Sequence, residues 1–279
     1  MAETAGSGSD DHSDQLMSIQ EAARTCNVRQ MRRALAAGVS PNRNVFSWVA
    51  PIHLLSRINR VDQIDLGARL ACLDLLRQSP DFDVNLPNDY GERAIHLLGW
   101  HAKSSDDVEF MRAVVDAGVD LNAVTNSRKA TALIYSIEAP DVPIGATAAK
   151  IDLLIRAGAS VTARDGDGRA PLDLAITEAE RCLAKLGTPY ERDGRQKLRA
   201  MRRVYPVLLA AGAALPAEAS DPYLQRVIAA GSFANYERQH LAKLTRMLTP
   251  RRGPSSPLRL VPPEVLRKIA AFAFHVGYY

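Results

Sequence analysis

The sequence contains few cysteines, few aromatic residues and no long apolar run. Its only cysteines are Cys26, Cys72 and Cys182, an odd and widely spaced set without a C-x-x-C pair. This set excludes a disulfide framework and a dithiol redox motif. We therefore expect three small buried side chains in a protein from a reducing compartment. No apolar stretch approaches the roughly 18 residues that a membrane-spanning helix needs.

The first residues also lack an apolar run. Residues 1–14 are rich in Gly, Ser and Asp, and this composition fits neither a secretory signal nor an Arg-rich transit peptide. We expect this segment to be disordered and acidic. Together with the absence of a membrane segment, it predicts a soluble intracellular protein, cytoplasmic or nuclear, that is not secreted.

The charge and composition favour a helical fold without naming a partner. The formal net charge is +4 with a pI near 9.0, a mild excess that does not by itself indicate nucleic-acid binding. Hydrophobic residues make up 47% of the chain, but aromatic residues only 6%. Plentiful Ala and Leu favour close-packed helices over sheets.

The motifs that usually carry chemistry are missing. His96 and His101 are five residues apart and do not form H-E-x-x-H. The segment 165–168 (D-G-D-G) resembles the start of a calcium loop, but Ile176 occupies the twelfth position, where that loop needs an acid. A turn that needs positive φ explains this segment better. We therefore expect no enzyme activity, no catalytic, cofactor-binding or metal site, and no cofactor.

Internal repetition is the strongest positive signal. Helix-ending glycines stand at Gly38, Gly118, Gly158 and Gly212, where a left-handed conformation suits glycine. The expected helix starts at 50–53 (A-P-I-H), 93–96 (R-A-I-H), 131–134 (T-A-L-I) and 170–173 (A-P-L-D) recur about every 40 residues. Repeats of this length predict a solenoid of helical hairpins.

Several of these units resemble ankyrin repeats. The best matches are 83–96, 117–122 and 156–161, which share the order of turn, T-P-L-H-like helix start, paired helices and G-A-D-V-N-like ending. The resemblance covers residues 15–216 and implies an all-α solenoid of about five repeats with short hairpin tips. In that family the tetrad histidine ties one turn to the next. It is kept here as His53 and His96, whereas Ile134 and Asp173 replace it.

Three units exceed the family's period of about 33 residues. We expect loop insertions at 57–68 and 138–148, and a third insertion at about 177–198. In the third, a helix from Asp173 to Leu186 is expected to break at 187–189 and to resume from Arg195 to Leu209. Residues 217–249 are expected to form a helical cap, with helices starting at Asp221-Pro222 and running from Phe233 to Leu248. Residues 250–279 read as a Pro-rich strap followed by an amphipathic helix.

The resemblance implies a non-catalytic scaffold that binds a protein partner through its hairpin tips and its concave inner-helix surface. Aromatic and Arg residues dominate interface energetics. The partner-binding candidates on or beside the tips are Arg43, Phe46, Trp48, Tyr90, Arg128, Lys129, Arg164 and Asp167. Trp48 is equally compatible with burial against the first repeat, and we expect Trp100 to be a core residue.

Two other functions remain open. The last helix resembles the opening of an F-box, which would make the chain a substrate-recognition adaptor of a cullin-type ubiquitin ligase. The residues that carry this resemblance are Val261, Pro262, Glu264, Val265, Leu266 and Ile269. The basic run 192–203 would suit nucleic acid, although the solvated face of an amphipathic helix explains it better, with Leu198, Met201, Tyr205 and Leu208 turned inward.

Overall fold

The computed structural model describes residues 19–42, 49–57, 65–139, 144–248 and 264–265. Every regular element in these ranges is an α-helix, which confirms the predicted all-α class. Residues 19–24 are helical. The helices that follow are α2 (Val28–Ala36), α3 (Pro51–Ser56), α4 (Leu66–Arg77), α5 (Ala94–His101), α6 (Ser105–Asp116), α7 (Ala132–Glu138), α8 (Ile144–Arg156), α9 (Pro171–Leu183), α10 (Glu191–Ala210), α11 (Pro222–Ala229) and α12 (Phe233–Leu248).

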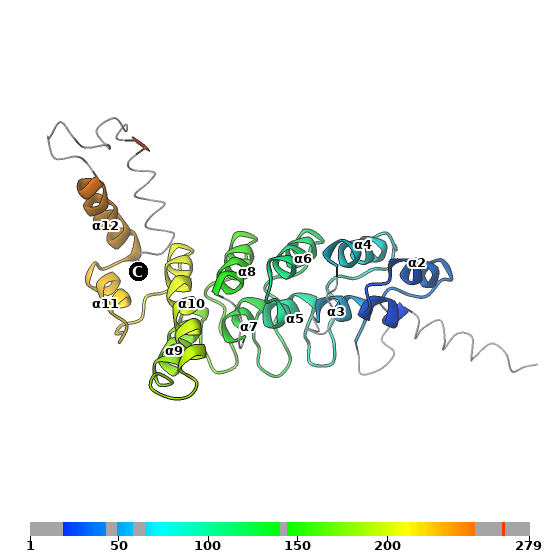
Figure 1. Cartoon of the computed structure of the whole chain (residues 1–279), viewed down its shortest axis with the longest axis horizontal. Coiled ribbons are helices and arrows are strands. Elements are labelled where there is room, and N and C mark those ends of the chain that lie inside the picture. Colours follow the sequence, from blue (N-terminus) through cyan, green and yellow to red (C-terminus); the bar gives the residue numbers. More distant parts are fainter. Residues whose placement is uncertain (1–18, 43–48, 58–64, 140–143, 249–263, 266–279) are drawn as a thin grey trace, which may run out of the picture.

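The helices form two rows along an elongated molecule (Figure 1). An inner row of short helices runs from α3 through α5 and α7 to α9, each in contact with the next. An outer row runs from α2 through α4, α6 and α8 to α10, again with successive contacts. Neither helix of a pair is able to bury its apolar side alone, so the pairs stack in sequence order.

Local signals explain where the helices begin and end. Pro51 and Pro171 open α3 and α9, at a position where a missing N–H costs no helical bond. Thr131 caps α7 by accepting a hydrogen bond from the Ile134 N–H. The four glycines predicted to end helices all have positive φ, between 82° at Gly38 and 104° at Gly158. The turn chemistry inferred from the sequence is therefore confirmed.

A ladder of asparagine amides joins successive repeats. Asn42 accepts from the Asp83 N–H at 2.9 Å and also donates to the Asp81 carbonyl. Asn85 bonds the next loop in the same way, through the Asp120 N–H at 2.6 Å and the Gly118 carbonyl at 3.3 Å. Asn122 repeats the pattern one unit further on, at residues 158 and 160. Each amide thus satisfies polar backbone groups of its neighbour and fixes the spacing of the stack.

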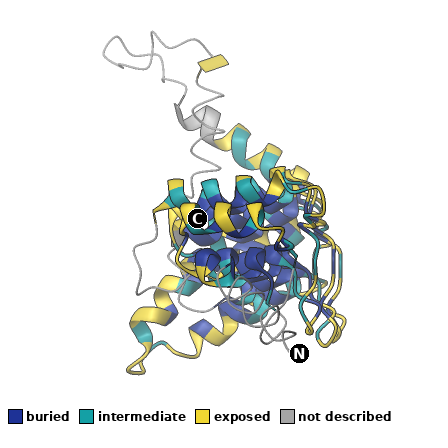
Figure 2. Cartoon of the chain, turned by 90° about the vertical axis from the view of Figure 1, so that its right-hand side faces the viewer, coloured by how far each residue is buried: buried dark blue, intermediate teal, exposed yellow. Residues whose placement is uncertain are grey.

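The main hydrophobic core lies between the two rows (Figure 2), and Ala139 and Ala146 form a small separate cluster. Phe110, Met31 and Tyr205 are among the largest fully buried side chains of the main core. The three cysteines are buried and free, as expected. Among the described helices, none combines the length and the apolar character that crossing a bilayer requires.

The insertion boundaries need correction. Residues 66–68 and 144–148, read from the sequence as loop, belong to α4 and α8. Asp65 caps α4 by accepting from the Ala68 N–H at 2.8 Å, and the first turns of α8 bury Ala146 and Thr147. Further on, α9 ends at Leu183 rather than Leu186, and α10 begins at Glu191 rather than Arg195. An acidic first turn suits the positive end of the helix dipole, which explains the earlier start of α10.

The last described helices match their expected ranges. Asp221 caps α11 through the Tyr223 N–H, and α12 runs from Phe233 to Leu248. Tyr205 of α10 stacks on Tyr223, and Tyr223 meets Tyr236 edge to face. This aromatic series joins α11 and α12 to the end of the array and covers its apolar face.

Candidate functional site

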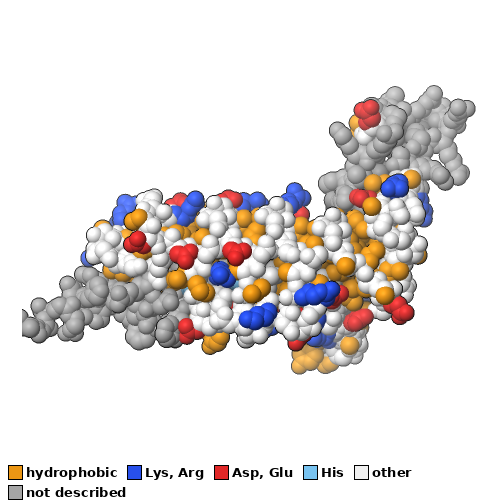
Figure 3. All heavy atoms as spheres, turned by 180° about the vertical axis from the view of Figure 1, so that it is seen from behind, with side chains coloured by type: hydrophobic (Ala, Val, Ile, Leu, Met, Phe, Trp, Pro, Cys, Tyr) orange, Lys and Arg blue, Asp and Glu red, His pale blue; other side chains and the backbone are white. Residues whose placement is uncertain are grey.

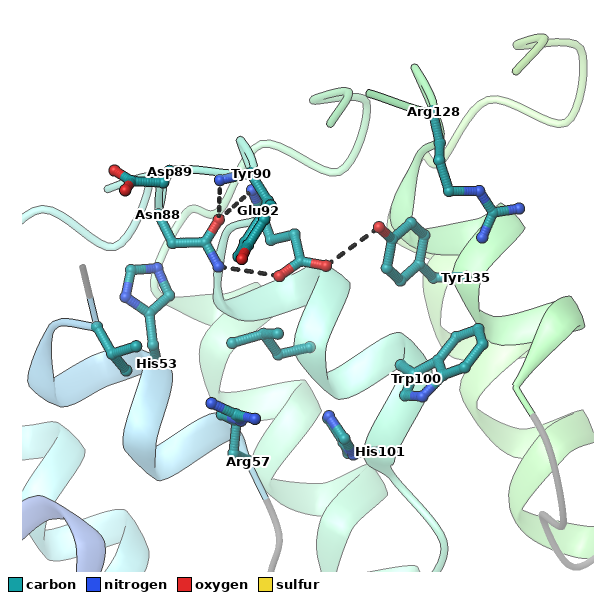
Figure 4. A pocket seen from close by; sticks show the side chains of 12 residues that line it. His53, Arg57, Asn88, Asp89, Tyr90, Glu92, Trp100, His101, Arg128 and Tyr135 are labelled. Carbon is teal, nitrogen blue, oxygen red and sulfur yellow. Dashed lines mark hydrogen bonds between the residues drawn. The ribbon is translucent and has the colours of Figure 1, made fainter. Parts of the chain in front are cut away.

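A cavity of about 610 Å³ opens on the inner row of helices, where three successive repeats meet (Figure 4). The start of the inner row, the turn at 88–92, α5, the following turn and α7 all contribute to its wall. The residues that line it are Val49, His53, Arg57, Asn88, Asp89, Tyr90, Glu92, Leu97, Trp100, His101, Arg128 and Tyr135. It is the candidate site because it combines concavity, aromatic surface and charge.

The turn at 88–92 forms the upper wall and is locked by Asn88. The Asn88 side-chain oxygen accepts from the backbone N–H groups of Tyr90 at 3.0 Å and Glu92 at 2.8 Å. The Asn88 side-chain nitrogen donates to Glu92 Oε2 at 2.9 Å. The Tyr135 hydroxyl donates to Glu92 Oε1 at 3.1 Å. Both oxygens of this half-buried carboxylate are therefore already bonded.

Aromatic rings line the side of the cavity towards α7. Trp100 and Tyr135 meet edge to face with ring centroids 5.9 Å apart. The guanidinium carbon of Arg128 lies 5.8 Å from the Tyr135 ring centroid. Arg128 also forms a 2.5 Å ion pair with Glu138. These contacts hold the aromatic surface in place before any partner binds, which lowers the entropy cost of binding.

Close backbone packing holds α5 against α7 next to these rings. A Cβ atom at Gly99 would lie 2.7 Å from the Ala132 carbonyl oxygen and 3.0 Å from the Ser136 hydroxyl. Only glycine therefore allows α5 and α7 to approach this closely. The Gly99 carbonyl accepts a 2.5 Å bond from Lys150 of α8, whose side chain is fully buried. The residues after Gly99 are Trp100 and His101, so this bond anchors the segment that carries both.

Two buried histidines hold the inner helices to the next loop. In His53, Nδ1 accepts from the Ala50 N–H at 3.0 Å and Nε2 lies 3.0 Å from the Leu86 carbonyl. His96 repeats both contacts, with the Arg93 N–H and the Ala123 carbonyl. The predicted role of His53 and His96 at the repeat joints is thus confirmed. Burial lowers the pKa of each histidine below 6.5.

At the two later joints other groups replace histidine. Ile134 is fully buried and contributes packing. Asp173 accepts from the Ala170 N–H at 3.0 Å, closing the helix start in the manner of the histidines, but among the described residues no hydrogen bond joins its side chain to the following loop.

Arg57 and His101 lie on the side of the cavity opposite Glu92 (Figure 4). Arg57 is exposed, and among the described residues no acidic group forms an ion pair with it. Burial is the main cause that lowers the pKa of His101 below 6.5, and the positive charges of Arg57 and Lys103 lower it further. His101 is therefore neutral near pH 7, and Arg57 provides the positive charge at this end.

The structure brings two of the predicted tip residues to the cavity, Tyr90 and Arg128. Their turns are adjacent, because the Asn126 N–H donates to the Tyr90 carbonyl at 2.8 Å. Tyr90 is 68% exposed, the value expected of a side chain available to a partner.

Three other predicted residues lie on tips but do not line the cavity. Lys129 is exposed with φ of 50°, Arg164 bonds the Gly168 carbonyl at 2.6 Å, and Asp167 pairs with Arg169 at 2.8 Å. The turn 165–168 is closed by hydrogen bonds to Asp165, which supports the turn interpretation of this acidic segment.

The remaining predictions fall partly outside the described residues. Arg43, Phe46 and Trp48 lie outside them, as do Val261, Pro262, Leu266 and Ile269. Of the F-box-like segment, Glu264 and Val265 are described, and both are helical and exposed.

Most of the lining, including Leu97 and Tyr135, was not predicted from the sequence as binding surface, and four of the missed residues are informative. Trp100, expected in the core, is only half-buried and lines the cavity. Arg57, Glu92 and His101 were not singled out as binding residues. Their position along the chain could have revealed them. All four lie within a few residues of the helix starts that contain His53 and His96, and residues at these positions face the inner surface of the stack.

The basic run on α10 is an amphipathic face, as the preferred interpretation held. Leu198, Met201, Tyr205 and Leu208 are buried, and several cations of the run have partners. Arg195 pairs with Glu191, Lys197 with Glu178 at 2.6 Å, and Arg202 with Asp221 at 2.9 Å. On the face drawn in Figure 3, basic and acidic side chains are interspersed rather than gathered by sign.

Within the described ranges, no cluster of His, Cys, Asp and Glu side chains is arranged to hold a metal ion. Comparison with known proteins adds no assignment: no family model matches the chain, and no curated protein matches it.

Proposed function

We propose that this chain is an ankyrin-type solenoid whose function is to bind a protein partner, without catalysis, through the cavity on its inner helices and the adjacent hairpin tips. The observation that supports this most directly is the cavity itself, which crosses three repeats and has the exposed Tyr90 ring at its rim. Its aromatic side chains are of the type that dominates protein interfaces.

The rigidity of the site supports binding rather than chemistry. Glu92 is held by Tyr135 and Asn88, and Arg128 is held by Glu138. Acid–base catalysis needs a group free to exchange a proton with a substrate, whereas these groups are engaged with one another. A preorganised surface loses little further entropy when a partner binds.

The test uses one binding protein identified by co-purification and then purified. Isothermal titration should show that Tyr90→Ala and Trp100→Ala each weaken its binding at least tenfold, as expected for truncated aromatic anchors that contribute about 2 kcal/mol. The matched control is Arg112→Ala, on the exposed face of α6, where Arg112 pairs only with Glu109. Equal binding by all three variants would refute the proposal.

Deletion of residues 258–279 separates this function from that of a ubiquitin-ligase adaptor. If the cavity is the binding site, the deletion variant still binds the partner, and Tyr90→Ala still weakens that binding at least tenfold. Loss of a cullin-type partner upon deletion, with Tyr90→Ala having no effect, would favour the adaptor.

A further inference from the structure

The charges around the cavity are unevenly placed, and their placement bears on what binds there. At the upper wall, both carboxylate oxygens of Glu92 already accept hydrogen bonds from neutral groups. Asp89 is exposed, and its carboxylate points outward from the turn (Figure 4). At the opposite side Arg57 has no ion pair with a described residue. On that side, the charge offered to a ligand is therefore the positive charge of Arg57.

A cationic ligand is disfavoured on the aromatic side of the cavity. There the Arg128 guanidinium already lies over the Tyr135 ring and pairs with Glu138, so a second cation would add repulsion. An anionic group beside Arg57 meets a guanidinium that pairs with no described residue, and guanidinium groups bind carboxylates strongly because of their planar donor geometry.

Between the charged ends the cavity wall is apolar and aromatic. Leu97 is a buried residue of the lining, and Trp100 and Tyr135 form one side. A ligand that fills the cavity therefore needs a bulky apolar side chain for this wall and an anionic group for Arg57.

Building on the proposed function, we propose that the cavity binds a peptide segment of the partner in which a carboxylate adjoins an aromatic or large aliphatic side chain. The apolar side chain lies against Leu97 and Trp100, and the carboxylate lies beside Arg57 and His101. An acidic residue next to such a side chain, or a C-terminal carboxylate, satisfies the same chemistry.

Two small molecules test the charge requirement directly. N-acetylphenylalanine carries the ring and the carboxylate, and N-acetylphenylalaninamide carries the same ring without charge. The sequence has two tryptophans, so in a Trp48→Phe variant the fluorescence reports Trp100 alone. We expect the carboxylate to bind about fivefold more tightly than the amide, the factor that one partly exposed ion pair provides.

Substitution of the cation provides the second arm. Arg57→Gln should remove the preference for the carboxylate and leave amide binding unchanged, whereas Arg112→Gln on α6 should change neither. Equal affinity for both molecules, tighter binding of the amide, no response to either molecule up to its solubility limit, or a preference that survives Arg57→Gln would each overturn the inference.

A proton NMR titration of His101 gives an independent readout in the unmodified chain, with His101→Gln used for assignment. Arg57, Lys103 and Lys150 act to lower the pKa of His101, while Glu92 raises it. A bound carboxylate adds a negative charge, so N-acetylphenylalanine should raise the pKa of His101, and the amide should leave it in place. The absence of any difference would contradict the inference even if Trp48→Phe failed to fold.

The result is distinguishable from failure of the proposed function. If the carboxylate preference is absent but Tyr90→Ala and Trp100→Ala still weaken binding of the purified partner, the surface is right and the ligand chemistry is wrong. If those two variants bind the partner normally, the proposed function fails whatever the small molecules do.

Discussion

Lys150 and Gly99 are joined across the two rows of helices: the lysine Nζ donates to the glycine carbonyl at 2.5 Å. The lysine side chain is fully buried, and the charged groups that act on it are Lys103, Lys197 and Asp107. Burial, with smaller contributions from Lys103 and Lys197, lowers the pKa of Lys150 from 10.5 to about 7. The bond fixes the end of α5 that carries Trp100 and His101. Below neutral pH, however, the buried Lys150 is protonated, and its charge is poorly solvated.

The first prediction concerns the pH dependence of stability. Between its folded-state pKa near 7 and its unfolded-state pKa of 10.5, Lys150 binds more protons when unfolded. The free energy of unfolding should therefore rise with pH, with a slope approaching about 1.4 kcal/mol per pH unit. Lys150→Met should remove this contribution. Urea unfolding of both proteins from about pH 6 to about pH 8.5 measures the difference, because titration of the thiols and phenols has little effect in that range.

Subtracting the two curves cancels the titrating groups that Lys150 does not influence. His101, whose pKa Lys150 lowers, is neutral at the alkaline end of the range, so the difference there belongs to Lys150. If the free energy of unfolding changed with pH equally in the wild type and in Lys150→Met, the lysine would bind the same number of protons in the folded and unfolded states, contrary to the prediction.

The second prediction concerns His53 and His96, whose pKa values are lowered mainly by burial. Both must be neutral to accept through Nδ1. Their stabilising contribution is fully present above the unfolded-state pKa of 6.5 and is lost as the pH falls from there through the lowered folded-state value. His96→Gln should lower the free energy of unfolding at neutral pH by about 1–3 kcal/mol and flatten the acid limb.

His53→Gln should behave in the same way, because its two bonds match those of His96. Urea midpoints measured at several pH values between about 5 and about 8 decide the matter. If the protein carrying both His53→Gln and His96→Gln lost stability on acidification just as the wild type does, other groups would be the cause of that loss.

The third prediction addresses the asparagine ladder. Asn85→Ala removes the bonds to the Asp120 N–H and the Gly118 carbonyl, and we expect a loss of about 1–2 kcal/mol by urea unfolding. The matched control is Asn235→Ala, whose amide bonds only within its own helical pair, to the Ala230 carbonyl. A similar loss for both variants would show that the cross-repeat bonds carry no special weight.

The fourth prediction concerns the buried ion pair between α4 and α6. Arg69 contacts Asp107 at 3.0 Å, donates to the Leu55 carbonyl at 2.8 Å and lies 3.8 Å from the Phe110 ring centroid. Asp107→Asn leaves the guanidinium buried without its counter-charge and should cost about 3–5 kcal/mol.

Arg69→Met combined with Asp107→Asn should cost less than the sum of the two single changes, since the double variant buries no charge. Urea unfolding of the four proteins measures this coupling. Simple additivity would mean that the two groups do not depend on each other.

Much of the fold follows from local signals. The helix-ending glycines, the prolines of α3 and α9 and the histidines of the inner helices each act within one or two turns, so the sequence was sufficient to predict them. The boundaries of α4 and α8 were misread because the apolar pattern of their first turns depends on neighbours far along the chain. Thr147 and Lys150 are polar, yet contacts with other repeats bury them.

The candidate site was predictable only in part, for a related reason. Tyr90 and Arg128 were recognised because exposed aromatic and Arg residues on turns are candidates wherever they occur. Trp100 and Arg57 belong to the site because α3, α5 and α7 stand side by side, and that proximity is a property of the stack rather than of any one segment.

The close approach at Gly99 fixes how α5 and α7 lie relative to each other. Side chains rotate to admit a larger guest, but two touching stretches of backbone do not. Trp100 stands on one of these helices and Tyr135 on the other, so a guest meets a pair of rings whose backbone spacing is already set. The side of the hollow that these rings form is therefore expected to keep its shape whether or not a guest is present.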